Sequence, residues 1–379
     1  YTLSLHDALP ICTASTTNIA SAGAYQIARN GSTDAYLAKF NSAGSIQWST
    51  YYGGSSQETG YGVACDLLGN AFITGQTNSI TTMASAGAFQ SSLSGTNDAF
   101  IASFTPAGIR SWGTYFGGTG SEIANAIALD PVTGNIAIVG NTTSSNVIAS
   151  AGAVQPALGG GVQDAFIAYF DATGARKWST YYGGSALDYG QSLCIDQNSN
   201  VIAVGGTFSS NNIATPGATQ PANGGDYDAY MVKINSLGQR LWGTFFGGTF
   251  YDYANGVAVD ANGQTMIAGY TTSLGLYGAG GISTAGAAQP AYAGGSYDGF
   301  VAKFDADLYV TVNQPYTDTM VCAGGTLQVF YSVLPAPQTF TAGNTFTAQL
   351  SDATGSFAAP VNIGSVTAVG SGTISCVIP

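Results

Sequence analysis

The side chains with the clearest potential for chemistry in this chain are carboxylic acids that recur at fixed spacing. Thirteen of the 20 acidic residues occupy three positions of one repeating pattern. The first position begins the phrase DAYLAKF and its copies, the second follows a Gly-Gly pair, and the third comes eight residues after the second. The first-position acids are Asp34, Asp98, Asp164, Asp228 and Asp298, the second-position acids are Glu58, Glu122, Asp188 and Asp252, and the third-position acids are Asp66, Asp130, Asp196 and Asp260.

Recurring acids of this kind have a catalytic, a metal-binding and a structural interpretation. Glycoside hydrolysis needs two carboxyl groups in distinct environments, whereas these acids repeat unchanged along the chain. Calcium is bound by carboxylate oxygens, which makes Glu58 with Asp66, and the equivalent pairs in later repeats, candidate ligands. No 12-residue calcium-loop pattern accompanies them. Because Asp side chains cap turns by accepting backbone N–H bonds, we predict a structural role for all three positions.

Other catalytic arrangements are absent from the sequence. The single histidine is His6, and no G-x-S-x-G elbow, G-x-x-x-x-G-K-[ST] loop or C-x-x-C pair occurs. We therefore predict that the chain is not an enzyme and holds no cofactor, with calcium as the alternative.

Four tryptophans recur with the same spacing as the acids. They lie in the phrases WSTYYGG, WGTYFGG, WSTYYGG and WGTFFGG, and they are Trp48, Trp112, Trp178 and Trp242. Such residues either pack between structural repeats or present a stacking face to sugars. Large aromatic side chains dominate the energetics of protein cores, so we predict the packing role.

The elements that position these residues are predicted to be β-strands. Each repeat holds four short stretches with alternation and β-branched or aromatic residues, in the first copy near residues 34–40, 46–52, 60–66 and 71–77. Four antiparallel strands per repeat are typical of a β-propeller blade. We predict an all-β fold, with four full repeats and partial ones over residues 12–307 and with units that start near residues 34, 98, 164, 228 and 298.

The two ends of the chain do not follow the repeat. Residues 1–11, YTLSLHDALPI, match one reading frame of a sequencing adapter codon for codon, so we predict an artefact rather than the tail of a signal peptide.

Residues 308–379 form a separate strand-rich region, in which Cys322 and Cys376 are candidates for a disulfide bond. Cys65 and Cys194 stand where other repeats have apolar residues, so we predict that both are buried.

Composition excludes several classes of partner. Only 7% of the residues are charged, and 8 bases against 20 acids give a net charge of -12. Such a chain cannot neutralise phosphates, which argues against binding to nucleic acid or to an anionic membrane surface. No apolar run approaches the roughly 18 residues of a spanning helix, so we predict no membrane insertion.

The co-spaced phrases resemble a known family. The series D-A-[FY]-[IL]-A-K-F, ST-Y-[YF]-GG, A-x-D-x-x-GN and GxT resembles the seven-bladed β-propeller repeat family, known as SBBP repeats, over about residues 12–307. The stretch GNTFTAQLSDATGSF resembles an Ig-like β-sandwich module of secreted proteins from gliding bacteria that use type IX secretion, here truncated. These resemblances imply a secreted or surface-exposed bacterial protein.

The function that we predict is therefore a secreted or cell-surface, non-enzymatic scaffold. It would display repeated weak sites to proteins or glycans, with affinity gained by multivalency. The main alternative is a carbohydrate-binding or accessory module of a larger secreted carbohydrate-active enzyme. A third interpretation, a purely structural stalk, would be favoured by the absence of an exposed aromatic or acidic cluster.

Overall fold

The protein is built from β-strands. The computed structural model describes residues 8–13, 19–276, 280–305, 309–312, 326–334, 344–350 and 361–377, and no helix occurs among them. Within these ranges nothing therefore qualifies as a helix long and apolar enough to cross a membrane. The chain divides into two compact units, one of Tyr1–Ala261 and Thr265–Lys303 and the other of Asn262–Gln264 and Phe304–Pro379.

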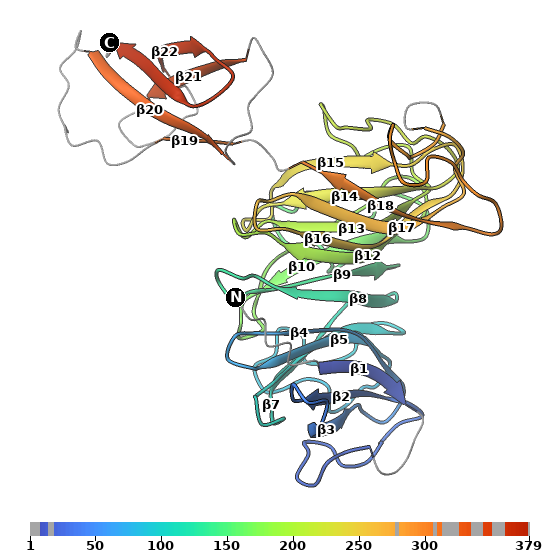
Figure 1. Cartoon of the computed structure of the whole chain (residues 1–379). Helices are drawn as coiled ribbons and strands as arrows, with labels where there is room; N and C mark the ends of the chain where they lie inside the picture. The colour runs from blue at the N-terminus through green and yellow to red at the C-terminus, as the bar shows by residue number, and fades with distance from the viewer. Residues whose placement is uncertain are drawn as a thin grey trace. The chain divides into compact units, whose positions relative to one another are not determined.

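The strands as far as Phe304 form a regular series (Figure 1). In chain order they are β1 (Ala8–Thr13), β2 (Asp34–Phe40), β3 (Ile46–Tyr52), β4 (Glu58–Cys65), β5 (Ala71–Thr77), β6 (Asp98–Phe104), β7 (Arg110–Phe116), β8 (Glu122–Leu129), β9 (Ile136–Thr142), β10 (Asp164–Phe170), β11 (Arg176–Tyr182), β12 (Asp188–Ile195), β13 (Val201–Thr207), β14 (Asp228–Ile234), β15 (Arg240–Phe246), β16 (Asp252–Val259), β17 (Thr265–Thr271) and β18 (Asp298–Phe304).

These strands form separate antiparallel sheets in which each strand lies beside its neighbours in sequence. Three sheets have four strands, namely β4 to β7, β8 to β11 and β12 to β15. Two sheets have three strands, namely β1 to β3 and β16 to β18. The prediction of an all-β repeat fold is confirmed at this level, since the four-stranded sheets are those of a propeller-like repeat. Each of these sheets is open, because its first and last strands do not pair with each other.

The four strands of one sequence repeat do not all belong to one sheet. The predicted strands at 34–40 and 46–52 are β2 and β3, whereas those at 60–66 and 71–77 are β4 and β5 of the next sheet. The connection through the Gly-Gly pair therefore leads from one sheet to the next. The longer loop of about 20 residues returns the chain to the same sheet, since β5 pairs with β6.

Strand β1 includes residues 8–11 of the predicted adapter segment. It pairs with β2 so that Thr13 lies opposite Asp34, the register that joins Thr77 to Asp98 in the next sheet. Backbone pairing needs an extended chain and not a particular side chain. The adapter origin of this segment stays a prediction, and His6 lies outside the described residues.

The apolar core lies between consecutive sheets. The first strand of each sheet packs on the preceding sheet, as β12 does on β8, β9 and β10. Leu193 and Ile195 of β12 join Val139 and Ile167 in one buried cluster. Strand β10 is buried along its whole length, because both of its faces are covered. Each fully buried side chain of this size contributes roughly 1.5–3 kcal/mol, so the array is held mainly by contacts between sheets.

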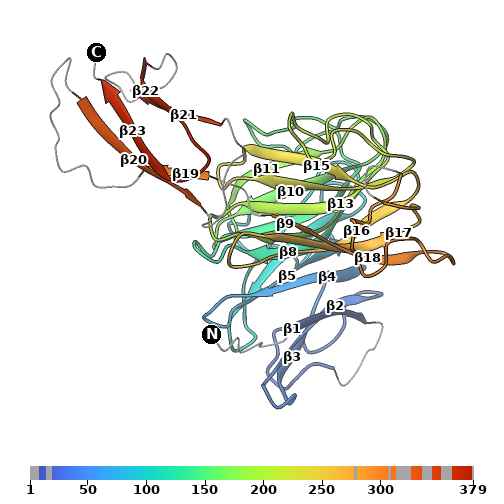
Figure 2. The same ribbon diagram turned by 45° about the horizontal axis from the view of Figure 1, so that its top comes forward.

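The second unit contains two small sheets (Figure 2). One consists of β19 (Tyr309–Val312), β20 (Thr326–Leu334) and β23 (Gly372–Val377), and the other of β21 (Thr345–Leu350) and β22 (Val361–Thr367). Tyr331, Phe346, Ile374 and Cys376 form the cluster that joins them. Cys376 is buried. Its predicted partner Cys322 lies outside the described residues, so the disulfide bond stays a prediction.

The tryptophans connect consecutive sheets. In three of the four, the indole N–H donates to a carbonyl in the turn between the third and fourth strands of the following sheet, from Trp48 to Pro106 (2.8 Å), from Trp112 to Ala172 (3.1 Å) and from Trp178 to Ser236 (3.1 Å). The turn glycine lies against the indole ring, and a Cβ on Gly238 would stand 2.9 Å from Cγ of Trp178. This geometry is that of packing between repeats.

Replacement of Gly238 by alanine tests the contribution of this contact. Gly238 has φ +83° and Gly44, at the equivalent turn of the first sheet, has φ +76° with open space around it. Both substitutions incur the cost of a left-handed alanine, about 1–2 kcal/mol, and only Gly238→Ala also displaces an indole ring. We expect Gly238→Ala to lower the free energy of unfolding in urea by about 1–2 kcal/mol more than Gly44→Ala does. Equal losses would contradict a stabilising role for the tryptophan contact.

Candidate functional site

The first- and second-position acids come together at the junction between sheets. Asp34 begins β2, Glu58 begins β4 of the next sheet, and Gly53 lies between them in the connection. A Cβ on Gly53 would stand 2.5 Å from the Asp34 Cγ and 2.5 Å from the Glu58 Oε2. The same pairing occurs around Gly117 and Gly183. Only glycine fits there, which explains the recurrence of the first residue of the Gly-Gly pair.

The carboxylates of the second-position acids are buried and accept hydrogen bonds from protein groups. The Asp188 carboxylate accepts bonds from the Gly184 N–H (2.7 Å), from the Ser209 hydroxyl (2.9 Å) and from the Thr207 hydroxyl. Asp252 has the equivalent three donors. Burial raises the pKa of Asp188 despite these bonds, which by themselves lower it. The acid fixes the start of its strand to the connection that precedes it.

The first-position acids are held by the glutamine that closes the AGAxQ phrase. Gln90 donates from Nε2 to Asp98 Oδ2 (2.5 Å) and accepts the Gly117 N–H at Oε1 (2.9 Å). Gln26, Gln155 and Gln220 make the same bridge in their own sheets. Gln289 donates to Asp298 in the same way (2.7 Å). The long loop is thus tied to the junction.

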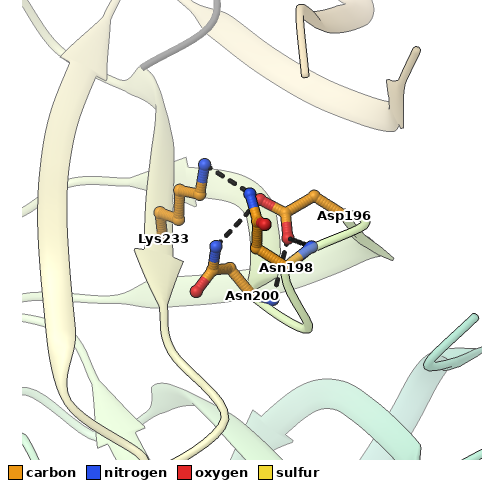
Figure 3. A network of polar contacts seen from close by, with 4 residues as sticks. All are labelled: Asp196, Asn198, Asn200 and Lys233. Atoms are coloured by element: carbon orange, nitrogen blue, oxygen red, sulfur yellow. Dashed lines mark hydrogen bonds and ion pairs between the residues drawn. The ribbon is translucent and has the colours of Figure 1, made fainter. Parts of the chain in front are cut away.

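The third-position acids cap the turn between the first two strands of each sheet. Asp196 accepts backbone N–H bonds from Asn198 and Asn200, both 2.9 Å, and a side-chain bond from Asn200 Nδ2 (3.0 Å) (Figure 3). Asp66 and Asp130 make comparable bonds in their turns. The calcium pairing that was the alternative to this structural role does not fit the positions of the two acids. Glu58 and Asp66 lie at opposite ends of β4, about 26 Å apart at roughly 3.3 Å per residue, so they cannot share an ion.

The other equivalent acids are separated in the same way, because each second-position acid begins a strand and each third-position acid follows its end. In the part of the chain that the structure describes, no group of three or more His, Cys, Asp or Glu residues is arranged to hold a metal ion.

A buried ion pair was not foreseen from the sequence. Lys233 of β14 points at Asp196, with Nζ 3.0 Å from Oδ2, and the two side chains are only 7% and 4% exposed (Figure 3). Burial raises the pKa of Asp196, but the Asn200 bonds and the Lys233 charge together hold it below its ordinary value. At the equivalent position of the preceding sheet, the Tyr169 hydroxyl donates to Asp130 (2.5 Å). The third-position acid therefore takes different partners in different sheets.

The prediction for the two repeat cysteines needs correction. Cys65 is exposed and Cys194 is only half-buried. Cys65 is the last residue of an edge strand, where a side chain meets solvent even though its register is apolar in other repeats. Burial raises the pKa of the Cys194 thiol to about 12, so it stays protonated at neutral pH.

An aromatic cluster, which the sequence reasoning missed, lies where β13 and β16 meet. It consists of Phe208, Tyr227, Tyr251, Tyr253 and Tyr270. The Phe208 and Tyr227 rings have centroids 4.3 Å apart, and Tyr253 is stacked on both Tyr227 (5.7 Å) and Tyr270 (5.5 Å). Phe208 is 39% exposed and Tyr251 44% exposed. The buried rings support the exposed ones, so the cluster forms a rigid apolar surface.

This cluster departs from the repeat. The residue equivalent to Phe208 is Asn78 or Thr143 in the two preceding sheets, and the residue equivalent to Tyr251 is Gln57, Ser121 or Leu187 in the three preceding sheets. The repeat fold forms without aromatic residues at these positions, so the aromatic side chains are not needed for it. A comparison of the copies register by register would have revealed the cluster from the sequence.

A comparison with known protein families agrees with the repeat fold. Residues 47–80 match the model of the family described as SBBP, beta-propeller repeat. Among solved structures, the chain is similar to one described as the crystal structure of an unknown function protein from Dyadobacter fermentans DSM 18053. That similarity has a TM-score of 0.33 and 10% identity over 95% of this chain and 86% of that chain. No curated protein matches.

Replacement of Lys233 by alanine should strongly destabilise the protein. The substitution leaves the Asp196 carboxylate buried without its counter-charge, which typically costs about 3–5 kcal/mol. Lys303 occupies the same register in β18 but is exposed, so Lys303→Ala should cost less than about 0.5 kcal/mol. Chemical denaturation at pH 7 compares the two variants. Similar losses for both would contradict the importance of the ion pair.

Proposed function

We propose that this chain is a non-enzymatic binding protein whose aromatic cluster binds neutral glycans. The observation that carries the proposal is the exposed, repeat-breaking surface of Phe208 and Tyr251. Aromatic and apolar side chains with a few polar neighbours are typical of ligand sites. The C–H face of a sugar ring stacks on such rings, while its hydroxyl groups need nearby hydrogen-bonding partners.

Polar groups lie beside the cluster. Tyr253 donates its hydroxyl to the Gln191 side-chain oxygen (2.9 Å), and Asp226, directly before Tyr227, is exposed. A carboxylate accepts hydrogen bonds from sugar hydroxyl groups. The chain has 8 basic residues and a net charge of -12, so anionic glycans are poorly suited to it.

The recurring acids support a non-catalytic role. Asp164, Asp188, Asp228 and Asp252 are fully buried. Their oxygens bond to the protein's own loops and strands. A catalytic carboxyl group must reach the substrate, which these residues do not.

The site that we propose is single rather than repeated. Within the described residues, the aromatic cluster occupies one junction, whereas the expected multivalent binding needs equivalent sites in each repeat. The sheet array then serves as the rigid platform for one surface.

The setting that we propose is the cell surface or the extracellular space. This follows from the resemblance to secreted propeller proteins and from the low content of charged residues. We further propose that the second unit is an Ig-like module of a protein that uses type IX secretion, which agrees with its two small sheets. If the chain adjoins a catalytic domain, the same surface would direct that domain to its polysaccharide.

Substitution of the exposed rings tests the proposal. The full chain is screened against a panel of neutral glycans, and the affinity of each ligand found is measured by calorimetry. We expect Phe208→Ala and Tyr251→Ala each to weaken binding about tenfold, which corresponds to about 1.4 kcal/mol. Tyr61→Ala is the matched control, because Tyr61 is 44% exposed on β4 outside the cluster. An absence of neutral glycan binding, or equal effects of all three substitutions, would contradict the proposal.

A further inference from the structure

Two of the carboxyl pairs contain a buried oxygen that has no hydrogen-bond partner. Asp164 and Asp228 are fully buried, and the Oδ1 atom of each accepts no bond. In the two earlier repeats, the same atom of Asp34 accepts the Gly31 N–H (3.1 Å) and that of Asp98 accepts the Gly95 N–H (3.2 Å). A buried polar atom left in this way needs a physical explanation.

The unpartnered oxygen and the second carboxyl group of its junction border the same Gly-Gly connection. A Cβ on Gly183 would stand 2.9 Å from Asp164 Oδ1 and 2.6 Å from Asp188 Oδ2, so both oxygens border the same glycine. At the next junction, Asp228 Oδ1 is 2.5 Å from the corresponding point on Gly247. The following residue, Gly248, donates its N–H to Asp252 Oδ2 (2.7 Å).

Among the described residues, no cationic side chain is one of the groups that act on Asp164 or Asp228. The groups that face Asp164 are Asp188 of β12, the phenols Tyr181 of β11 and Tyr230 of β14, and the neutral donors Gln155 and Gly159. Glu122 of β8 faces the same Tyr181 phenol.

The surroundings of Asp228 are similar. Its neighbours are Asp252 of β16 and the neutral donors Gln220 and Gly224. Two ionised carboxylates at either junction would be buried without a counter-charge, which is costly.

The number of donors differs between the two members of a pair. Asp188 accepts three hydrogen bonds, which favour its ionised form. Asp164 accepts bonds from Gln155 Nε2 (2.8 Å) and from the Gly159 N–H (2.7 Å), both at Oδ2. A proton on Asp164 Oδ1 would remove one charge, supply the missing hydrogen bond and leave both existing bonds intact.

We propose that the Asp164–Asp188 and Asp228–Asp252 pairs are proton-binding sites, each of which holds one proton between its two carboxyl groups. The proton resides on Oδ1 of Asp164 or Asp228 and is donated to the ionised partner. Its uptake neutralises one of two adjacent charges, so it strengthens the junction between consecutive sheets.

The pKa values agree with this assignment. Burial raises the pKa of Asp164 to about 6 and that of Asp228 to about 7, and the negative charge of the partner acid adds to the effect of burial. Since an unfolded Asp titrates near 3.8, the folded state binds more protons between about pH 4 and pH 7. The stabilisation is complete below the unfolded pKa and is lost as the pH rises through 6 and 7. For Asp164 this is about a 100-fold change in the folding equilibrium.

Asparagine substitutions of the full chain distinguish the two members of a pair. In Asp164→Asn, the amide NH₂ takes the place of the protonated oxygen and donates to Asp188 at any pH. We expect this variant to be more stable than the wild type at pH 8, by up to about 100-fold in the folding equilibrium, and to depend less on pH. Asp228→Asn should behave in the same way. Asp188→Asn should be less stable at every pH, because its three donors lose an anionic acceptor.

Infrared difference spectroscopy of the wild type supplies a measurement that needs no folded variant. The carbonyl band of a protonated carboxylic acid should be present at pH 5 and decrease as the pH rises to 8. Wild-type stability that does not change with pH, no such band, or loss of stability in Asp164→Asn at pH 8 would overturn the proposal. Stabilisation of the wild type at pH 8 by millimolar calcium, abolished in Asp164→Asn, would also overturn it in favour of a metal site.

Discussion

The fold depends on how the chain passes from one sheet to the next. At each such point, the acid that begins the new sheet bonds back to the Gly-Gly connection, as Asp188 does to the Gly184 N–H. The glutamine of the preceding loop bonds to the same connection, as Gln155 does to Gly183. These bonds fix the angle at which the new first strand lies on the previous sheet. The apolar contacts and the tryptophan stacking require that alignment, because close packing tolerates little displacement.

Much of this architecture could be predicted from local patterns. Alternation and turn residues located the strands, since these signals act over a few residues. The phase of the sheets could not be predicted, because two strands joined by a short connection usually pair, whereas here β3 and β4 belong to different sheets. The alternative that paired Glu58 with Asp66 as calcium ligands also depended on a long-range feature, because an extended strand carries the two residues apart.

Features that differ between repeats were harder to predict than features that recur. Recurrence revealed the acids, the glycines and the tryptophans, which serve either the junctions between sheets or the turns within a sheet. The aromatic cluster occupies one junction. The Lys233–Asp196 ion pair forms at one turn of the described residues, although Lys39 and Lys303 share the register of Lys233, so an average over the copies conceals both features. In a repeat protein, however, residues that every junction needs must recur, and those that depart from the pattern serve either one local contact, as Lys233 does, or another purpose. The departures are therefore where a specific function is expected.

The aromatic cluster and the second proton-binding pair are adjacent in the chain. Tyr227 precedes Asp228, Tyr251 precedes Asp252, and the two tyrosines are joined by a parallel backbone bridge. Neighbouring residues of an extended chain point to opposite sides, so the acids turn inward while Tyr251 reaches the surface. The backbone segments that position the aromatic cluster are therefore the same segments that carry the buried carboxyl groups of Asp228 and Asp252. The proposed binding surface and the proposed proton-binding pair therefore share one structural element, the backbone bridge between Tyr227 and Tyr251.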